Sequence, residues 1–445
     1  MNPPGDKHVS GHGDVESASQ DALIDYKTLT WWQGGIVLAA ETVSLGILSL
    51  PSVMASVGLV PGIILILILS ALSTYSGLVL AEFREEYPHV QNFGDALEVI
   101  GQPIGMGALF QEIFGWAQVI FQIMVMGSHL LTFTICMNTL TNSSTCTIVW
   151  AVVGLGIFWV LNLPRTLKYT SWMSLASCLS IIIATLMTVG DVSVGHSIAE
   201  SWTIARSLPF PTAFLGVTNI AIAFCQLSLK FSSWIMSVIS EFKKPEDFPK
   251  AMALLQFIDT SLYLIAAIVI YVYVGEKVPS PALSAAGTVA MRKAIWGVAI
   301  PTIVIAGVIY GHVAAKYIFV RLFRNTKHLE RRTKLSTVSW WGVTFVIWAL
   351  SMIIAESIPV FNSLLGLIAA AFVSWFSYGL PGVFWLWMHK GNWFSNWRQT
   401  SRFLANAVLL VSGIMLCVLG LWGSIEAIAG EKKTKPWACA SNAAE

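Results

Sequence analysis

The 445-residue sequence predicts an all-α polytopic membrane protein: two five-helix units in inverted orientation plus an eleventh transmembrane helix. Hydrophobic residues make up 56% of the chain and charged residues 11%, whereas a soluble domain usually carries about 25% charged residues. The mean hydropathy is +0.70. Eleven apolar runs are long enough to cross a bilayer, and two of them, five spans apart, are interrupted by polar residues.

Each predicted span is an apolar run of about 20 residues, the length that crosses the hydrocarbon core as a helix. The third, sixth, eighth and tenth runs are longer, so tilt or extension past the bilayer is expected. The eleven runs are 31–56, 60–83, 108–138, 147–163, 169–190, 212–240, 252–275, 295–323, 338–354, 359–388 and 403–426.

The composition divides the chain into one membrane domain and two tails. Residues 1–27 are polar and predict a disordered cytoplasmic tail without a secretory signal. The membrane domain spans 28–426, with repeat one at about 31–190, repeat two at about 212–388 and helix 11 at about 403–426. Residues 427–445 form a C-terminal tail. The balanced charge indicates no nucleic-acid partner; the bilayer is the expected surroundings, and no oligomeric state is predicted.

The six cysteines show no metal-ligand spacing, so neither a metal site nor a cofactor is expected. They are interpreted as small packing residues, and only Cys146 and Cys439 fall outside the predicted spans. No His-x-x-x-His motif or pair of aspartates at membrane depth supports an enzyme, and no catalytic residue is proposed.

Lysine and arginine predict the orientation. With the N-terminus in the cytoplasm, sixteen of them lie in cytoplasmic loops and four in outer loops. Short loops rich in these residues stay in the cytoplasm, so the N-terminus is expected inside and, with an odd span count, the C-terminus outside. Lys432, Lys433 and Lys435 oppose this, but a tail counts less than short loops. The sequon at Asn142 lies in a predicted outer loop.

The first run contains Glu41, Ser44, Gly46 and Pro51, where a lipid-facing helix is uniformly apolar. A carboxylate at membrane depth is costly, and proline cannot donate to the carbonyl four residues back. Non-helical backbone persists at that depth only where it is buried in protein or lines a cavity. We therefore predict a broken helix, the element that builds the binding sites of secondary transporters.

The sixth run is also interrupted, by Cys225, Gln226, Ser228 and Lys230. Five spans separate it from the first run, and an odd repeat length inverts the second copy in the membrane. The two breaks are therefore expected to meet near the bilayer midplane. Helix packing is the alternative for single residues such as Ser228, because serine is an ordinary interface residue in membrane bundles.

Two segments resemble the amino acid/auxin permease superfamily. The first is the run from Glu41 to Leu50-Pro51 with Ala55 to Gly58, and the second is 240–251, similar to the superfamily's loop after helix 6. The overall pattern is most similar to fungal neutral and aromatic amino acid permeases. Members often have asparagine at Glu41, glycine at Ser44 and glycine-histidine at Cys225-Gln226. The resemblance implies the leucine-transporter fold, proton- or sodium-driven transport and amino acid substrates.

An amino acid zwitterion needs donors for its carboxylate and acceptors for its ammonium. Backbone N–H groups after the first break suit the carboxylate, and carbonyls freed at both breaks suit the ammonium. Apolar residues of spans 3, 6 and 8 are expected around the side chain. The predicted substrate-binding residues are Thr42, Ser44, Leu45, Gly46, Ile47, Phe121, Phe224, Cys225 and Gln226.

Glu41 is the first candidate for a coupling proton, and a fixed counter-charge for the substrate ammonium is the alternative. His129 and His312 titrate near neutral pH when exposed, although a lone membrane histidine is more often packed and neutral. Asp259 is expected near the cytoplasmic end, where an ion pair with a basic loop residue is the alternative to a relay. Few hydroxyls occur around 304–313 in span 8, which favours H⁺ over Na⁺.

The sequence thus predicts a secondary active transporter of neutral amino acids, including large apolar and aromatic ones, by proton symport and alternating access. The plasma membrane is favoured, and a vacuolar carrier of the same fold is the first alternative. A sensor that binds amino acids without transporting them is the second. It ranks lower because such sensors usually carry a larger cytoplasmic extension.

Overall fold

The structure is a computed structural model that describes residues 30–90, 92–165, 170–195, 197–207, 209–224, 245–324, 326–330, 333–430 and 435–443. These residues form helices and connecting loops. Eight helices are long and apolar enough to cross a membrane, and a ninth span results if a bent pair in the first segment is counted as one. Two shorter apolar helices, Thr147–Leu161 and Phe210–Phe224, occupy the fourth and sixth predicted spans. Each predicted span therefore contains a helix, and the count of eleven spanning helices stays a prediction.

The first segment is broken, as the sequence predicts. Helix α1 (Trp31–Thr42) ends at Thr42, the 3₁₀ helix η1 covers Leu45–Ser49, and α2 (Leu50–Val57) completes the segment. The two halves meet at 55°. Pro51 does not cause the break, because it lies in the first turn of α2, where its missing N–H has no helical partner to lose. The interruption falls at Val43 and Ser44, both with extended backbone.

Helices of very different length follow the first segment. Helices α4 and α13 are short and lie outside the predicted spans, and the tenth span contains a π-helical turn region, η6. The bounds are α3 (Leu59–Glu86), α4 (Phe93–Gly101), η2 (Gln102–Ile104), α5 (Gly107–Thr141), α6 (Thr147–Leu161), α7 (Thr170–Gly195), α8 (Phe210–Phe224), η3 (Pro245–Asp247), α11 (Phe248–Val274), η4 (Gly275–Lys277), η5 (Ala282–Ala285), α12 (Val289–Leu322), α13 (Lys327–Glu330), α14 (Lys334–Ser357), α15 (Phe361–Ile368), η6 (Ala369–Gly379), α16 (Leu380–Met388) and α17 (Trp397–Gly430).

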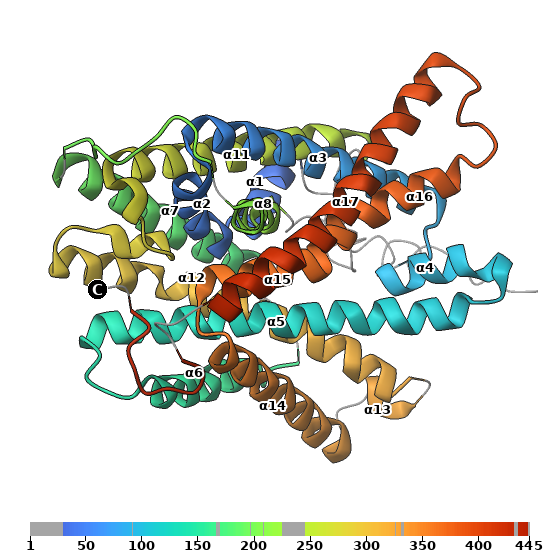
Figure 1. Ribbon diagram of the computed structural model, residues 1–445. Coiled ribbons are helices and arrows are strands. Elements are labelled where there is room, and N and C mark those ends of the chain that lie inside the picture. Colours follow the sequence, from blue (N-terminus) through green and yellow to red (C-terminus); the bar gives the residue numbers. More distant parts are fainter. Residues whose placement is uncertain are drawn as a thin grey trace, which may run out of the picture.

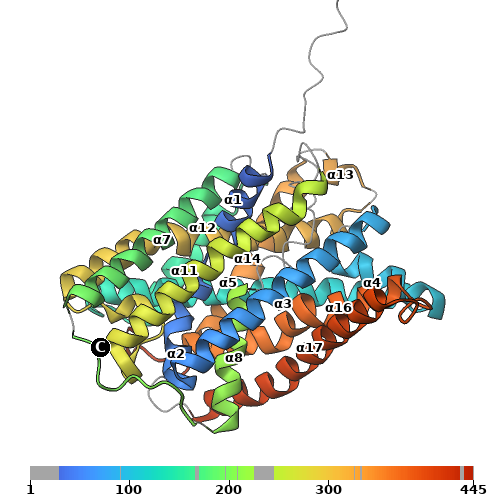
Figure 2. The same ribbon diagram turned by 90° about the horizontal axis from the view of Figure 1, so that it is seen from above.

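The long helices share one general direction, so the bundle has two ends (Figures 1 and 2). Helices α4 and α13 lie at one end, on the right of Figure 1, which we call the α4 end. The loop between α5 and α6 and the C-terminal segment 435–443 lie at the other end, which we call the disulfide end.

The surface and interior follow the pattern of a protein in lipid. Large apolar side chains are exposed along the middle of the outer helices, for example Ile64, Leu67 and Ile68 on α3. Hydroxyl side chains such as Ser73 and Thr132 are buried inside, where most donate to carbonyls. In lipid, polar side chains are stable inside the protein where they have hydrogen-bond partners, and apolar side chains are stable on the outer surface. This distribution therefore fits a protein surrounded by lipid.

A disulfide closes the disulfide end. Cys146, before α6, is bonded to Cys439 in the C-terminal segment. The interpretation of all cysteines as packing residues is therefore wrong for these two, and it fits the buried thiols Cys136 and Cys178. Local sequence patterns do not reveal this pairing, because 293 residues separate the two cysteines and only the folded bundle brings them together.

Hydrogen bonds also hold the C-terminal segment 435–443 against α5 and α6. The Thr147 hydroxyl donates to the Ala440 carbonyl (2.8 Å), and the Asn138 side chain donates to the Asn442 side-chain oxygen (2.8 Å). The Asn442 amide in turn donates to the Thr134 hydroxyl (2.9 Å). The C-terminal segment is thereby attached to α5 and α6 over several residues.

We expect Cys439→Ser to lower thermal stability, because the disulfide restricts the unfolded chain and holds the C-terminal segment on α5. A disulfide typically contributes about 2–4 kcal/mol. The measurement is the thermal unfolding midpoint of purified protein without reductant, with Cys417→Ser as the matched control because Cys417 is a free, half-buried thiol. An unchanged midpoint in Cys439→Ser would show that the link adds no stability.

Candidate functional site

The break in the first segment lies against α8, backbone to backbone. A Cβ placed on Gly46 would lie 2.7 Å from the Cα of Ala223, which is closer than real Cβ atoms approach. Only glycine permits this approach. The predicted meeting of the first break with the sixth span therefore occurs at Gly46 and Ala223. Cys225, Gln226 and Lys230, which follow in the sixth run, lie outside the described residues.

The described part of α8 runs to Phe224, and side chains of two other helices donate to carbonyls of its last two described residues. The Ser73 hydroxyl of α3 donates to the Phe224 carbonyl (2.7 Å), and the Tyr263 hydroxyl of α11 donates to the Ala223 carbonyl (3.3 Å). The Phe224 and Tyr263 rings lie 5.2 Å apart, centroid to centroid. Phe224 and Tyr263 thus form an aromatic pair near the break, and the Ala223 and Phe224 carbonyls accept hydrogen bonds from Tyr263 and Ser73.

Asp259 faces the end of α1, and its expected depth near the cytoplasmic end of its span stays a prediction. It is buried in α11, and the Thr42 hydroxyl donates to its Oδ2 at 2.6 Å. The Thr42 hydroxyl also lies 3.1 Å from the Ala39 carbonyl. The side chain of Glu41 lies outside what the structure describes.

The Thr42 contact suits both protonation states of Asp259. A hydroxyl has one hydrogen and two acceptor positions. With Asp259 ionised, Thr42 donates to the carboxylate. With Asp259 protonated, the carboxylic acid donates to Thr42, and Thr42 donates to the Ala39 carbonyl. A proton can therefore be added or removed here without leaving the hydroxyl unpaired.

A cavity of about 20 Å³ adjoins the break. That volume is about enough for one water molecule or a small cation. Hydroxyls of Ser44, Ser174 and Ser177 line it together with Tyr310 of α12. The Ser44 and Ser174 hydroxyls have no hydrogen-bond partner among the described residues, so they are available to an occupant of the cavity.

The other predicted residues have structural partners. The Phe121 ring of α5 contacts the rings of Phe372 and Phe376 of η6, at 5.9 and 6.2 Å between centroids. His129 is buried, and its Nδ1 donates to the Ile303 carbonyl at 3.1 Å, which agrees with the packed, hydrogen-bonded alternative. His312 is buried with its ring 5.3 Å from that of Trp340.

The backbone after the break only partly matches the expected carboxylate donors. The N–H of Ile47 already donates to the Ser44 carbonyl over 3.4 Å, so it is less available than the sequence suggested. Leu45 and Gly46 lie immediately after the break, and Gly46 is close to Ala223 of α8.

Sequence reasoning missed Ser73, Tyr263, Ser174 and Ser177. A signal existed for the serines: Ser174 and Ser177 are three residues apart, which places their hydroxyls next to each other on a helix. No comparable signal marked Tyr263, because one tyrosine in an apolar run is usually a packing residue.

A broken first segment that meets the sixth inside a helical bundle defines a class of membrane transporter. Solved structures share this fold. Mhp1, a nucleobase-cation-symport-1 family transporter in a closed conformation with bromovinylhydantoin bound, gives a TM-score of 0.56 at 14% identity, covering 94% of this chain and 96% of its own. MhsT in complex with L-phenylalanine gives 0.53 at 13% identity, covering 87% of this chain and 98% of its own. The fold is therefore that of the leucine-transporter type.

Within that class the family is shown by sequence. The model of the transmembrane amino acid transporter protein family matches residues 27–426, and the chain belongs to this family. The N amino acid transport system protein of Neurospora crassa is 28% identical over 98% of this chain and 95% of that protein. A transmembrane transporter of Fusarium pseudograminearum is 26% identical over 97% of this chain and 92% of that protein. The resemblance stated from the sequence is confirmed.

Proposed function

We propose that the protein is a secondary active transporter of neutral amino acids, including large apolar and aromatic ones, and that it works by proton symport and alternating access. One observation carries the proposal: the break at Val43 and Ser44 lies beside α8, where Gly46 contacts Ala223. Backbone groups freed by such a break are the usual recognition elements for an amino acid in this class of fold.

The substrate carboxylate is proposed to meet the N–H groups of Leu45 and Gly46. The ammonium is proposed to meet carbonyls at the end of α1 and of α8, around Thr42 and Phe224. The Phe224 ring packs on the Tyr263 ring, with 5.2 Å between the ring centroids, and it suits an apolar or aromatic substrate side chain. Asp259 is close enough to the break to serve the ammonium or a coupling proton, but it already binds Thr42.

Proton coupling is supported by the Thr42 contact with Asp259, which accommodates both protonation states. Glu41, one residue before Thr42, is the second candidate for the coupling proton. His129 and His312 rank after Asp259 and Glu41. Sodium is the rival coupling ion. It prefers several oxygen ligands, and the small cavity at Ser44, Ser174 and Ser177 offers three hydroxyls beside the broken backbone.

The orientation we propose puts the α4 end in the cytoplasm. Arg84 lies in the last turn of α3, which leads into α4, and Arg165 donates to the Leu329 carbonyl of α13 (3.3 Å), as expected for cytoplasmic loops. The disulfide at the opposite end supports an outer or lumenal location, because disulfides persist in oxidising compartments. The C-terminus is then outside. Plasma membrane is proposed over vacuole, and fluorescence microscopy of the tagged chain distinguishes the two.

The deciding experiment is uptake by proteoliposomes containing the purified protein. We expect leucine and phenylalanine to accumulate when the outside is acidic. One proton per substrate supports about tenfold accumulation per pH unit. The matched arms replace the pH gradient with a Na⁺ gradient, and offer arginine or glutamate as substrate.

Accumulation driven by Na⁺ alone would overturn proton coupling but not transport. Preference for arginine or glutamate, with leucine and phenylalanine inert, would overturn the neutral substrate class. Saturable binding of leucine without any uptake or exchange would favour the sensor alternative.

A further inference from the structure

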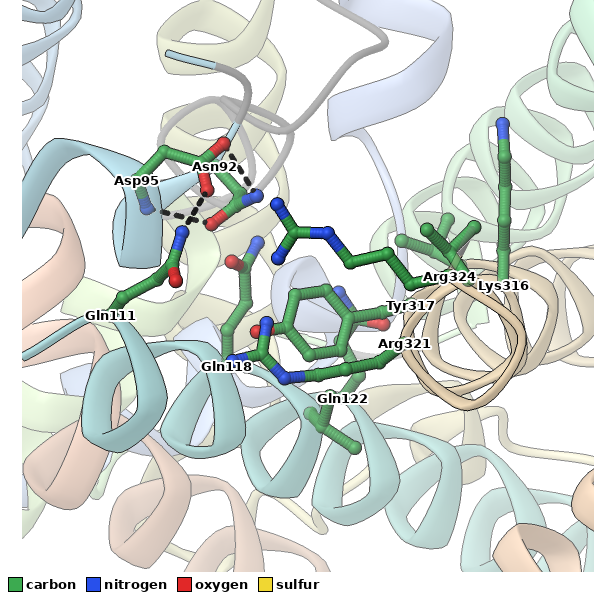
Figure 3. A pocket seen from close by; sticks show the side chains of 12 residues that line it. Asn92, Asp95, Gln111, Gln118, Gln122, Lys316, Tyr317, Arg321 and Arg324 are labelled. Carbon is green, nitrogen blue, oxygen red and sulfur yellow. Dashed lines mark hydrogen bonds between the residues drawn. The ribbon is translucent and has the colours of Figure 1, made fainter. Parts of the chain in front are cut away.

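A second cavity, distinct from the break, opens at the α4 end between α4, α5 and α12 (Figure 3). Its volume is about 360 Å³, enough for a small organic molecule. The lining residues are Asn92, Asp95, Gln111, Gln118, Val119, Gln122, Val313, Lys316, Tyr317, Val320, Arg321 and Arg324. None of them lines the small cavity beside Ser44.

Positive charge prevails in the lining of this cavity. Lys316, Arg321 and Arg324 line it from the α12 side, and Asp95 is the one carboxylate among the described lining residues. Arg321 is paired with Glu112 of α5, which is not a lining residue. Within the described parts of the chain, neither Lys316 nor Arg324 forms an ion pair. These two cations are therefore available to a negatively charged ligand.

Asp95 is held by its own chain. Its carboxylate accepts hydrogen bonds from the side chains of Asn92 (2.9 Å) and Gln111 (3.2 Å), and it has a further interaction within the protein. These contacts fix the start of α4 against α5. Asp95 therefore stabilises the wall of the cavity, and no ligand group is assigned to it.

Two glutamines of α5 make the cavity floor polar. Gln118 and Gln122 are 4% and 5% exposed, and both line the cavity. Neither amide atom of Gln118 has a hydrogen-bond partner among the described residues, and the side-chain oxygen of Gln122 also lacks one. An amide nitrogen donates and an amide oxygen accepts, whereas a hydroxyl group does both. A ligand with several hydroxyl groups would satisfy this floor.

The cations and the amides lie at different depths of the same cavity. In Figure 3 the guanidinium groups of Arg321 and Arg324 extend from the α12 side toward α4 and α5, and the Lys316 side chain points to one side. Arg324 follows the end of α12 and is exposed, whereas Gln118 and Gln122 are buried. The unpaired positive charge is therefore at the mouth, and the unpartnered amides are at the floor.

We propose that this cavity binds a polyol phosphate, either free in solution or as the headgroup of a lipid. The guanidinium of Arg324 matches the geometry of a phosphate group, and Lys316 adds a second positive charge at the mouth. The polyol hydroxyls donate to and accept from Gln118 and Gln122. Basic pockets between transmembrane helices are known to hold lipid headgroups, so both sources of the ligand are physically reasonable.

The test is calorimetric titration of the purified full-length chain in detergent with three probes. Inositol 1-phosphate carries both the phosphate and the hydroxyls, inorganic phosphate carries only the charge, and inositol carries only the hydroxyls. We expect saturable binding of inositol 1-phosphate, binding of inorganic phosphate about tenfold weaker or less, and no detectable binding of inositol. A charge-assisted hydrogen bond and the floor contacts each contribute about a factor of ten or more.

Two variants separate the mouth from the floor. Arg324→Gln is expected to weaken both phosphate probes by about tenfold or more. Gln118→Leu is expected to weaken inositol 1-phosphate and to leave inorganic phosphate unchanged. Without ligand, Gln118→Leu should unfold at the same or a higher temperature, because leucine leaves no buried polar atom unpaired. Lys390→Gln is the matched control, since Lys390 is an exposed cation in the turn after α16 and outside the cavity.

Nanodiscs identify the source of the ligand. If inositol 1-phosphate binds in phosphatidylcholine discs but is displaced when the discs contain phosphatidylinositol, the lipid headgroup occupies the site. If it binds equally in both, the ligand is a soluble polyol phosphate. No binding in phosphatidylcholine discs, equal weakening by Lys390→Gln, or inorganic phosphate binding as tightly as inositol 1-phosphate would overturn the proposal. The assay uses no amino acid, so its outcome is independent of the proposed transport function.

Discussion

We expect Gly46→Ala to reduce leucine uptake by about a hundredfold, the cost of displacing reacting or binding groups by about 1 Å. The added Cβ would lie 2.7 Å from the Cα of Ala223 and 3.1 Å from its Cβ. These are atoms of a helix backbone and its shortest side chain, so no flexible group can move aside. The first segment and α8 must separate, and the break changes position relative to Phe224.

The matched control is Gly190→Ala on α7. Gly190 is also helical and has no atom within 4 Å of its added Cβ, so alanine fits there without displacement. Helix propensity alone favours alanine at both positions. Uptake is normalised to the folded protein recovered after size-exclusion chromatography. If Gly46→Ala transported leucine within twofold of Gly190→Ala, the close approach at Ala223 would not be part of the transport site.

We expect Asp259→Asn to abolish accumulation driven by a pH gradient while exchange of internal for external leucine continues. Asparagine keeps the shape of the side chain and accepts a hydrogen bond from Thr42, but it cannot gain or lose a proton. The accumulation ratio should fall from about tenfold per pH unit to about one. Empty proteoliposomes measure accumulation driven by the pH gradient, and proteoliposomes loaded with unlabelled leucine measure exchange. One preparation provides both measurements.

Three further variants separate the contributions of Thr42, Asp259 and Glu41 to coupling. Thr42→Ser keeps the hydroxyl that contacts Asp259 Oδ2 at 2.6 Å, so coupled uptake should persist, whereas Thr42→Val removes it and should weaken coupling. Glu41→Gln tests the neighbouring carboxylate. If it loses both accumulation and exchange while Asp259→Asn loses only accumulation, Glu41 holds the substrate ammonium. Unchanged accumulation in Asp259→Asn would assign the proton to Glu41 or His129.

Much of the architecture was predictable from local patterns. Apolar runs near 20 residues predict spans because backbone groups must be paired within the helix in lipid. The helix in each predicted run follows from that constraint, and so does the break, because Glu41, Ser44 and Gly46 interrupt an apolar run. The family resemblance was predictable because it rests on contiguous residues.

The meeting of distant residues was decided only by the tertiary structure. Asp259 lies 217 positions from Thr42, and nothing in its own run showed which helix it faces. The same applies to Cys146 and Cys439, to Ser73 at the Phe224 carbonyl and to the polar cavity between α4, α5 and α12. Hydropathy determines which segments enter the membrane, because that depends on local composition. The packing of their faces sets which side chains meet, and this depends on the whole bundle.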